Sequence, residues 1–216
     1  MAQHDLVISL IPYTFHPLVI EAAMAAKKHF VSTSYVSAVM AGYDAAAKEA
    51  GITVMNEIGV DPGIDHLYAM KTITETHARG GQVLSFTSYC GGLPAPECSN
   101  NPLGYKLSWS GRGVLLAAGN PAKYLEDGKV VEIPGPRLLY DGPKEIHIYP
   151  GFNFEGYPNR DSTPYNERYG IPECQTVLRG TLRYKGNPAF IRSLGQVRAF
   201  ATKKRKKKKK KEKEEY

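Results

Sequence analysis

The first third of the chain alternates short apolar runs with segments that favour helix, and this alternation limits the possible folds most. Residues 6–11 form an almost continuous apolar run that Pro12 stops, as expected of a buried parallel strand. Residues 30–35 and 52–55 are rich in β-branched side chains and predict two more strands. Three strands separated by helix-length segments indicate a parallel sheet.

Helices are predicted between these strands. Pro17 opens a helical stretch over 18–28, because proline is tolerated in the first turn of a helix. Ser37 is placed to cap an alanine-rich helix that runs to Ala50, and Gly51 supplies a left-handed stop.

A third helix is predicted over 64–71, with Asp61 as its N-cap and Pro62 as its first residue. The complete order of strands and helices predicts an open α/β sheet, because crossovers between parallel strands are right-handed. We expect helices on both faces of this sheet.

The glycine-rich turn that normally opens a dinucleotide-binding unit is missing from the sequence. No G-x-G-x-x-G motif occurs, since Gly59 and Gly63 stand in Gly-Val-Asp-Pro-Gly and the pair Gly91-Gly92 follows a later strand. Three strands alone would also leave apolar edges unpaired. We therefore expect residues 1–78 to form an incomplete Rossmann-like sheet that starts halfway through its domain.

From residue 79 the sequence is richer in glycine, proline and aromatic residues, and it predicts a truncated mixed α/β domain over 79–196. Its expected strands are 82–90, 129–133, 146–149 and 176–184, and its expected helices are 110–118 and a last one that starts at Asn187.

The positive charge of the chain is confined to its end. The whole chain has a net charge of +7, and residues 203–216 carry ten Lys or Arg and three Glu, which accounts for all of it. The remainder is neutral, so the overall charge does not indicate a nucleic-acid groove in the folded part. We expect residues 197–216 to be a disordered, lysine-rich tail.

The three cysteines form no CxxC pair and no zinc-ligand spacing, so no metal site is expected. We interpret Cys90, Cys98 and Cys174 as reduced thiols. No signal peptide and no apolar stretch of membrane-spanning length occurs, and we expect a cytoplasmic protein.

Seven motifs in a fixed order carry a family resemblance. They are Ser9-Leu-Ile-Pro-Tyr-Thr-Phe15, Thr33-Ser-Tyr-Val36, Asn56-Glu-Ile-Gly-Val-Asp-Pro-Gly-Ile-Asp-His66, Ser88-Tyr-Cys-Gly-Gly-Leu-Pro-Ala-Pro-Glu97, Asn101-Pro-Leu-Gly-Tyr105 with Trp109, Tyr157-Pro-Asn-Arg-Asp-Ser162 and Arg179-Gly-Thr-Leu-Arg183. Residues 4–195 thereby resemble saccharopine reductase, the NADP-dependent, glutamate-forming saccharopine dehydrogenase of the fungal lysine pathway. The family's N-terminal glycine-rich unit and its C-terminal part have no counterpart here.

The resemblance implies an oxidoreductase. NADPH would reduce the imine of glutamate and 2-aminoadipate 6-semialdehyde to saccharopine, and the hydride chemistry would belong to the cofactor. The complete enzyme would be a cytoplasmic homodimer with an NADP-binding domain and a substrate-binding domain. Without the glycine-rich turn we expect the chain by itself to bind NADPH weakly and to be inactive.

The resemblance also assigns residues to the site. NADP would contact Leu10, Ser32, Thr33, Gly59, Val60, Asp61 and Trp109. Saccharopine would contact Thr33, Ser34, Asp61, Arg160, Gly180, Thr181 and Leu182. The candidates for a catalytic role are Asp61 and Cys90, although water or groups of the substrate could also transfer the protons.

Several of these residues have a structural alternative. Asp61 can cap a helix, and Arg160 can pair with Asp161 on a surface turn instead of holding a carboxylate with its bidentate fork. Trp109 can belong to the core, and Cys90 can be a buried, inert thiol. His66, in the first turn of the third helix, is interpreted as structural.

The tail has two interpretations. It is either a basic extension that binds nucleic acid nonspecifically through phosphate, or a translated intron that begins near Val197. A catalytically inactive, truncated product with such a tail is the alternative to the enzyme hypothesis.

Overall fold

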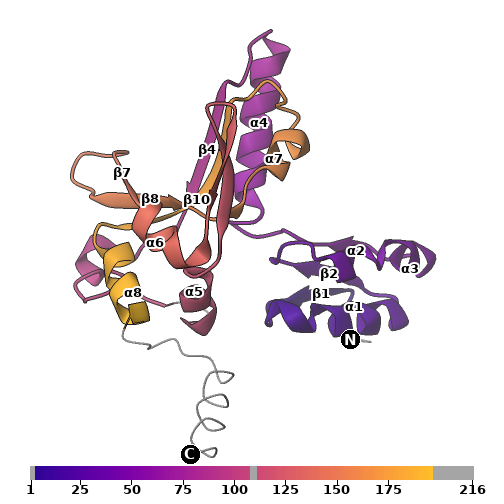
Figure 1. Cartoon of the computed structure of the whole chain (residues 1–216). Helices are drawn as coiled ribbons and strands as arrows, with labels where there is room; N and C mark the ends of the chain where they lie inside the picture. Colours follow the sequence, from indigo (N-terminus) through magenta and orange to yellow (C-terminus); the bar gives the residue numbers. More distant parts are fainter. Residues whose placement is uncertain (1–2, 108–110, 197–216) are drawn as a thin grey trace, which may run out of the picture. The chain divides into compact units, whose positions relative to one another are not determined.

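The computed structural model describes residues 3–107 and 111–196 and divides the chain into two compact units, Met1–Gly81 and Gln82–Tyr216 (Figure 1). We call them unit 1 and unit 2 and describe each by itself. Trp109 and the lysine-rich tail lie outside the described residues.

Unit 1 contains a three-stranded parallel sheet with the strand order β1-β2-β3. Its elements are β1 (Leu6–Ser9), a 3-10 helix (Tyr13–Phe15), α1 (His16–Ala25), β2 (His29–Ser32), α2 (Ala38–Ala41), α3 (Asp44–Glu49), β3 (Val54–Met55) and α4 (Ile64–Ala78). The strands and helices follow the predicted order, although β3 is shorter than its apolar run.

The helices α1, α2 and α3 cover one face of this sheet, not both as predicted. One buried cluster joins Ile20, Ala23, Phe30, Met40, Ala47 and Ile52 from these helices, β2 and the residues before β3. On the opposite face Leu6, Ile8 and Met55 are 45%, 63% and 48% exposed. The reason is topological, because strands added in one direction by right-handed crossovers place their connections on the same side.

The predicted helix from Ser37 to Ala50 is broken in two. The Ser37 hydroxyl caps α2 by accepting a hydrogen bond from the Met40 N–H at 3.2 Å, as predicted. Gly42 then ends α2, since glycine is unfavourable inside a helix. Gly51 has a φ of 69° and supplies the predicted left-handed stop.

The helix α4 does not begin as predicted. Its N-cap is Gly63, whose φ is 153°, and the Asp65 carboxylate accepts the Gly63 N–H at 2.8 Å. A side chain at Gly63 would lie 2.1 Å from the Gly59 carbonyl oxygen, so the close turn requires glycine. Asp61 and Pro62 therefore precede the helix, and the prediction that Asp61 is its cap is wrong.

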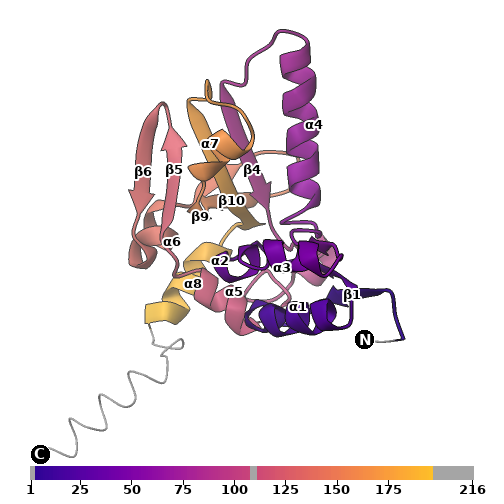
Figure 2. The ribbon, with the colours of Figure 1, turned by 90° about the vertical axis from the view of Figure 1, so that its right-hand side faces the viewer.

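Unit 2 is built on a seven-stranded mixed sheet with the path β6-β5-β10-β8-β7, to which β4 adds on β10 and β9 on β5. The strands are β4 (Ser85–Cys90), β5 (Ala122–Glu126), β6 (Lys129–Ile133), β7 (Lys144–Ile146), β8 (Phe154–Pro158), β9 (Arg160–Asp161) and β10 (Thr176–Tyr184). The helices are α5 (Gly111–Ala117), α6 (Leu138–Asp141), α7 (Pro164–Arg168) and α8 (Asn187–Gln196), with 3-10 turns at Pro96–Cys98 and Gly135–Arg137. Figure 2 shows the β5–β6 hairpin beside β10, with α6 and α8 near one end of it.

The long strand β10 organises unit 2, since it pairs in parallel with β4 and in antiparallel with β8 and β5. The sequence predicted β6 and β10 with the observed bounds. The predicted strand over 146–149 is wrong, because β7 ends at Ile146. Among the described residues, β7 pairs with β8 alone. Its Lys144 and Glu145 are exposed, so β7 lacks the apolar pattern by which strands are recognised.

Candidate functional site

The predicted ligand residues of unit 1 gather at the carboxyl ends of its three parallel strands, where open α/β sheets bind their ligands. Leu10 follows β1 and is 73% exposed. Ser32 ends β2, with Thr33 and Ser34 directly after it, and Gly59, Val60 and Asp61 follow β3. The sheet order makes these ends neighbours, so residues far apart in sequence share one edge.

Ser32 differs from its neighbours because its side chain is completely buried. Its hydroxyl donates to the Asn56 Oδ1 at 2.7 Å, and its carbonyl accepts the Ile58 N–H at 3.1 Å. The Ser34 carbonyl likewise accepts the Glu57 N–H at 3.0 Å. Ser32 thus fixes the loop after β3 to the loop after β2.

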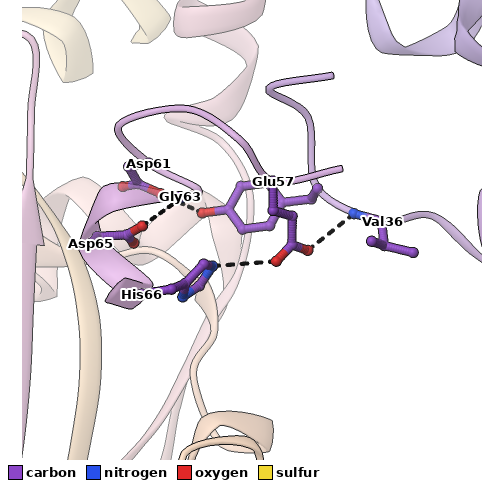
Figure 3. A network of polar contacts seen from close by, with 7 residues as sticks. Val36, Glu57, Asp61, Gly63, Asp65 and His66 are labelled. Atoms are coloured by element: carbon purple, nitrogen blue, oxygen red, sulfur yellow. Dashed lines mark hydrogen bonds and ion pairs between the residues drawn. The ribbon is translucent and has the colours of Figure 1, made fainter. Parts of the chain in front are cut away.

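Two further side-chain contacts join the same two loops (Figure 3). The Tyr35 hydroxyl donates to the Asp61 Oδ1 at 2.6 Å. The Glu57 Oε1 accepts the Val36 N–H at 3.1 Å, and its Oε2 lies 3.3 Å from the His66 Nε2. Figure 3 shows Glu57 between Val36 and His66, so this carboxylate links the β2 loop to the first turn of α4.

Glu57 holds this position with a φ of 62°, in the left-handed region that non-glycine residues rarely occupy. Such strained residues occur where the surrounding contacts determine the backbone. The contact with Glu57 supports the structural role that was predicted for His66.

The turn from Gly59 to Gly63 brings the chain back on itself. The Gly59 N–H donates to the Pro62 carbonyl at 2.9 Å, and a side chain at Gly59 would lie 3.2 Å from the Thr33 Cβ. Val60 is 68% exposed and Asp61 is exposed as well. The turn therefore presents these two side chains to solvent beside Thr33.

Unit 2 brings its own predicted residues together around β10. Cys90, the half-buried last residue of β4, pairs with Thr181 in the parallel register, and Gly180 pairs with Tyr89. A Cβ atom added at Gly180 would lie 2.5 Å from the Tyr89 Cε1. The Tyr89 ring therefore packs directly on this glycine. Burial raises the pKa of Tyr89.

Thr181 and Leu182 are 8% and 7% exposed. Burial also raises the pKa of Tyr157, while the side-chain hydrogen bond to Thr181 works in the opposite direction. The side chains of Thr181 and Leu182 thus serve the packing of unit 2, and their contact with a substrate stays a prediction.

Arg160 lies in the short strand β9, with Ala122 of β5 as its register partner. Arg160 is exposed, and its backbone has a φ of 58°. The preceding Asn159 donates its N–H to the Arg179 carbonyl at 3.0 Å, which places Arg160 near the Gly180 segment. The Asp161 Oδ1 accepts from both the N–H and the hydroxyl of Thr163, at 2.9 and 2.7 Å.

The buried Cys174 contrasts with Cys90. Its thiol donates to the Thr176 carbonyl at 3.0 Å, and burial raises its pKa, so it is an inert structural thiol. None of the three cysteines forms a disulfide.

Sequence reasoning missed Tyr35 and Glu57 as parts of the site. Both stand inside motifs that were singled out, Thr33-Ser-Tyr-Val36 and Asn56-Glu-Ile-Gly. Their position two or three residues beyond a strand end was the signal that could have found them. Trp109, predicted to contact NADP, lies outside the described residues, as does the basic segment expected to bind nucleic acid.

The edge described for unit 1 suits part of a dinucleotide. Hydroxyl groups at Thr33 and Ser34 can bond a ribose, and the exposed side chains of Leu10 and Val60 can pack on a flat ring. The sequence holds no glycine-rich turn for a pyrophosphate.

An α/β unit with polar residues at the carboxyl ends of its parallel strands, followed by a mixed sheet, is an arrangement found in dinucleotide-binding proteins. Comparison with known families agrees. Residues 1–55 match the saccharopine dehydrogenase NADP binding domain, and residues 59–213 match the saccharopine dehydrogenase C-terminal domain. The chain belongs to the saccharopine dehydrogenase family.

Individual relatives are similar over most of the chain. It is 66% identical to the saccharopine dehydrogenase [NADP(+), L-glutamate-forming] of Pyricularia oryzae and 57% identical to that of Saccharomyces cerevisiae, in both cases over 90% of the chain. It is 52% identical over 186 residues to the mitochondrial alpha-aminoadipic semialdehyde synthase of Bos taurus. The chain spans 43% of the length of the two fungal relatives.

A solved structure confirms the fold. The apo, histidine-tagged saccharopine dehydrogenase (L-Glu forming) from Saccharomyces cerevisiae superposes with a TM-score of 0.82 at 57% identity, covering 89% of this chain and 43% of that one. The predicted fold class, a Rossmann-like parallel sheet followed by a mixed α/β domain, is confirmed. Over the described ranges, no helix is both long and apolar enough to cross a membrane.

Proposed function

We propose that this chain supplies parts of the cofactor-binding and substrate-binding domains of an NADP-dependent, glutamate-forming saccharopine dehydrogenase in lysine biosynthesis. The reaction is the reduction of the imine of glutamate and 2-aminoadipate 6-semialdehyde to saccharopine. The observation that carries the proposal is the match over 194 residues at 57% to 66% identity to three fungal enzymes of this activity. We propose residues 1–78 as part of the NADP-binding domain and residues 79–196 as part of the substrate-binding domain, whereas the two family models divide the chain earlier, between residues 55 and 59.

Within unit 1, the residues at the strand ends hold the nicotinamide end of NADPH, which supplies the hydride. Leu10, Val60 and Thr33 line this edge, and Gly59 keeps the turn close enough to Thr33 for one continuous surface. Ser32 acts through its contact with Asn56, because its own hydroxyl is buried.

Asp61 is the residue we propose for proton transfer. Its carboxylate is exposed at the strand ends and accepts the Tyr35 hydroxyl at 2.6 Å, so a proton can pass between the two groups. Thr33 and Ser34 bind the substrate beside it.

Within unit 2, Arg160 binds a carboxylate of saccharopine. An exposed guanidinium can form two parallel hydrogen bonds with a carboxylate, and saccharopine carries three such groups. In the register of β10 with β4 and β8, Gly180, Thr181 and Cys90 are neighbours. This neighbourhood supports the proposal that the Gly180–Leu182 segment contacts the substrate. We further propose a cytoplasmic homodimer, in keeping with the three free thiols.

A chimeric enzyme tests the proposed function. Residues 4–195 of this chain replace the matching segment of the Saccharomyces cerevisiae relative, and NADPH formation from saccharopine and NADP is followed at 340 nm. We expect a kcat/KM within about tenfold of that of the parent enzyme. Loss of a residue that transfers a proton would lower kcat/KM by more than this. A folded chimera that binds NADPH but does not oxidise saccharopine would contradict the proposal.

A further inference from the structure

A completely buried histidine joins two strand ends of unit 1. His16 is the first residue of α1 and has an exposed fraction of 0%. Its Nδ1 lies 2.9 Å from the Ser9 hydroxyl, and its Nε2 lies 2.9 Å from the Ser34 hydroxyl. Ser9 ends β1 and Ser34 follows β2, so the imidazole spans neighbouring strand ends.

The ring is neutral in this environment. Burial lowers the pKa of His16, and the Phe30 ring packs edge-on against it with a centroid distance of 6.0 Å. A neutral imidazole has one donor and one acceptor nitrogen, and a serine hydroxyl can take either part. Both nitrogens of His16 are therefore satisfied in either tautomer.

The two serines are not equivalent. Ser9 is 4% exposed, so its bond with the Nδ1 lies inside unit 1. Ser34 is only half-buried, and its N–H donates to the Ser32 hydroxyl at 3.4 Å. One nitrogen of the ring is thus anchored in the core, while the other bonds a hydroxyl that can still meet a ligand.

We propose that His16 is a positioning residue for substrate binding, which holds the Ser34 hydroxyl at the ligand edge from an anchor on Ser9. The proposal rests on the function proposed above for Ser34. His16 does not touch the substrate; it fixes the rotamer of Ser34 and leaves the remaining hydrogen-bonding capacity of this hydroxyl for a polar group of saccharopine. The Ser34 side chain is already ordered before the substrate binds, so the entropy cost of ordering it does not reduce the affinity for the substrate.

Two amide substitutions separate the two bonds of the ring. The glutamine amide extends about as far as the Nε2 and can bond Ser34, whereas the shorter asparagine amide is close to the Nδ1 position and can bond only Ser9. In the chimeric enzyme we expect His16→Asn to raise the KM for saccharopine about 3- to 10-fold, the effect of one lost hydrogen bond. His16→Gln should stay within about twofold, as should the Kd for NADPH in both variants.

A double substitution shows whether the effect passes through Ser34. If it does, His16→Asn combined with Ser34→Ala raises the KM no more than Ser34→Ala alone. Additive effects, equal effects of the two amides, or a parallel loss of NADPH affinity would overturn the proposal and leave His16 with a role in folding only.

Two further outcomes are a His16→Asn variant that does not fold and a chimera that is inactive. If His16→Asn does not fold, Ser9→Ala takes its place. It removes the anchor of the imidazole, so we expect the KM for saccharopine to rise about 2- to 5-fold, less than in Ser34→Ala, and an unchanged KM overturns the proposal. A chimera with the original His16 that binds NADPH but shows no saccharopine-dependent reaction overturns the proposed function itself. The imidazole 15N shifts then still report whether Ser34→Ala perturbs the Nε2, which separates failure of the network from failure of the function.

Discussion

Units 1 and 2 build their candidate sites in different ways. In unit 1 the site residues lie in loops after parallel strands, and hydrogen bonds such as Tyr35–Asp61 and Ser32–Asn56 join loop to loop. In unit 2 the site residues lie within or beside strands that β10 brings into register. Unit 1 thus depends on its turns for the geometry of its site, and unit 2 on its strand pairing and packing.

The largest expected effect concerns the turn of unit 1. Gly63→Ala places a Cβ 2.1 Å from the Gly59 carbonyl oxygen at a φ of 153°, whereas Gly51→Ala meets nothing within 4 Å at a φ of 69°. We expect Gly63→Ala to lower the free energy of unfolding by about 3 kcal/mol and Gly51→Ala by about 1 kcal/mol. Urea unfolding of both variants measures this, and equal losses would contradict the role given to the Gly59–Gly63 approach.

Next in size is the catalytic contrast between the units. Asp61→Asn keeps the shape of the side chain but removes its proton acceptor, so we expect kcat/KM of the chimera to fall about 100-fold. Cys90→Ser in unit 2 should cost less than about tenfold, because serine keeps the size of this half-buried side chain and proton transfer is assigned to Asp61. Steady-state assays at saturating NADP compare the kcat/KM of the two variants. A larger loss of kcat/KM for Cys90→Ser than for Asp61→Asn would indicate that the proton-transfer residue lies in unit 2.

A smaller effect is expected from packing in unit 2. Gly180→Ala brings a Cβ to 2.5 Å from the Tyr89 ring and 2.7 Å from the Tyr157 carbonyl oxygen. We expect about 2 kcal/mol less stability, as for other overpacked positions. The Tyr89→Leu background relieves the contact with the ring, so a cost that is the same in both backgrounds would show that Tyr89 is not its cause.

The smallest expected effect is a pH dependence of unit 1. Burial lowers the pKa of His16 below its ordinary value near 6.5, so the unfolded chain takes up the proton first as the pH falls. The stabilisation by neutral His16 is therefore complete above about pH 6.5 and is lost as the pH falls toward the folded-state value. The stability difference between the original chain and His16→Gln should shrink on acidification in urea titrations, and a constant difference would show that His16 does not titrate.

The same contrast explains what the sequence could predict. In unit 1, each strand and helix carries its own periodic pattern, so the order of elements and the cluster of strand ends followed from local residues. The start of α4 did not, because the cap depends on the approach of Gly63 to Gly59 and on the Asp65 carboxylate, which no local propensity encodes.

Prediction was weaker in unit 2 for a physical reason. The strand β10 has nine residues, six of them buried, and its apolar pattern gave the observed bounds. Strands β7 and β9 are short and largely exposed, so only their partners define them. The neighbourhood of Arg160 and Gly180 is made by such pairings and cannot be read from spacing alone.

Saccharopine-dependent reduction of NADP by the chimeric enzyme tests the central claim most directly. The account expects an increase in absorbance at 340 nm with saccharopine and NADP together, no increase when saccharopine is omitted, and a loss of about 100-fold on Asp61→Asn. A folded chimera that forms no NADPH from saccharopine, or one that is indifferent to Asp61→Asn, would contradict it.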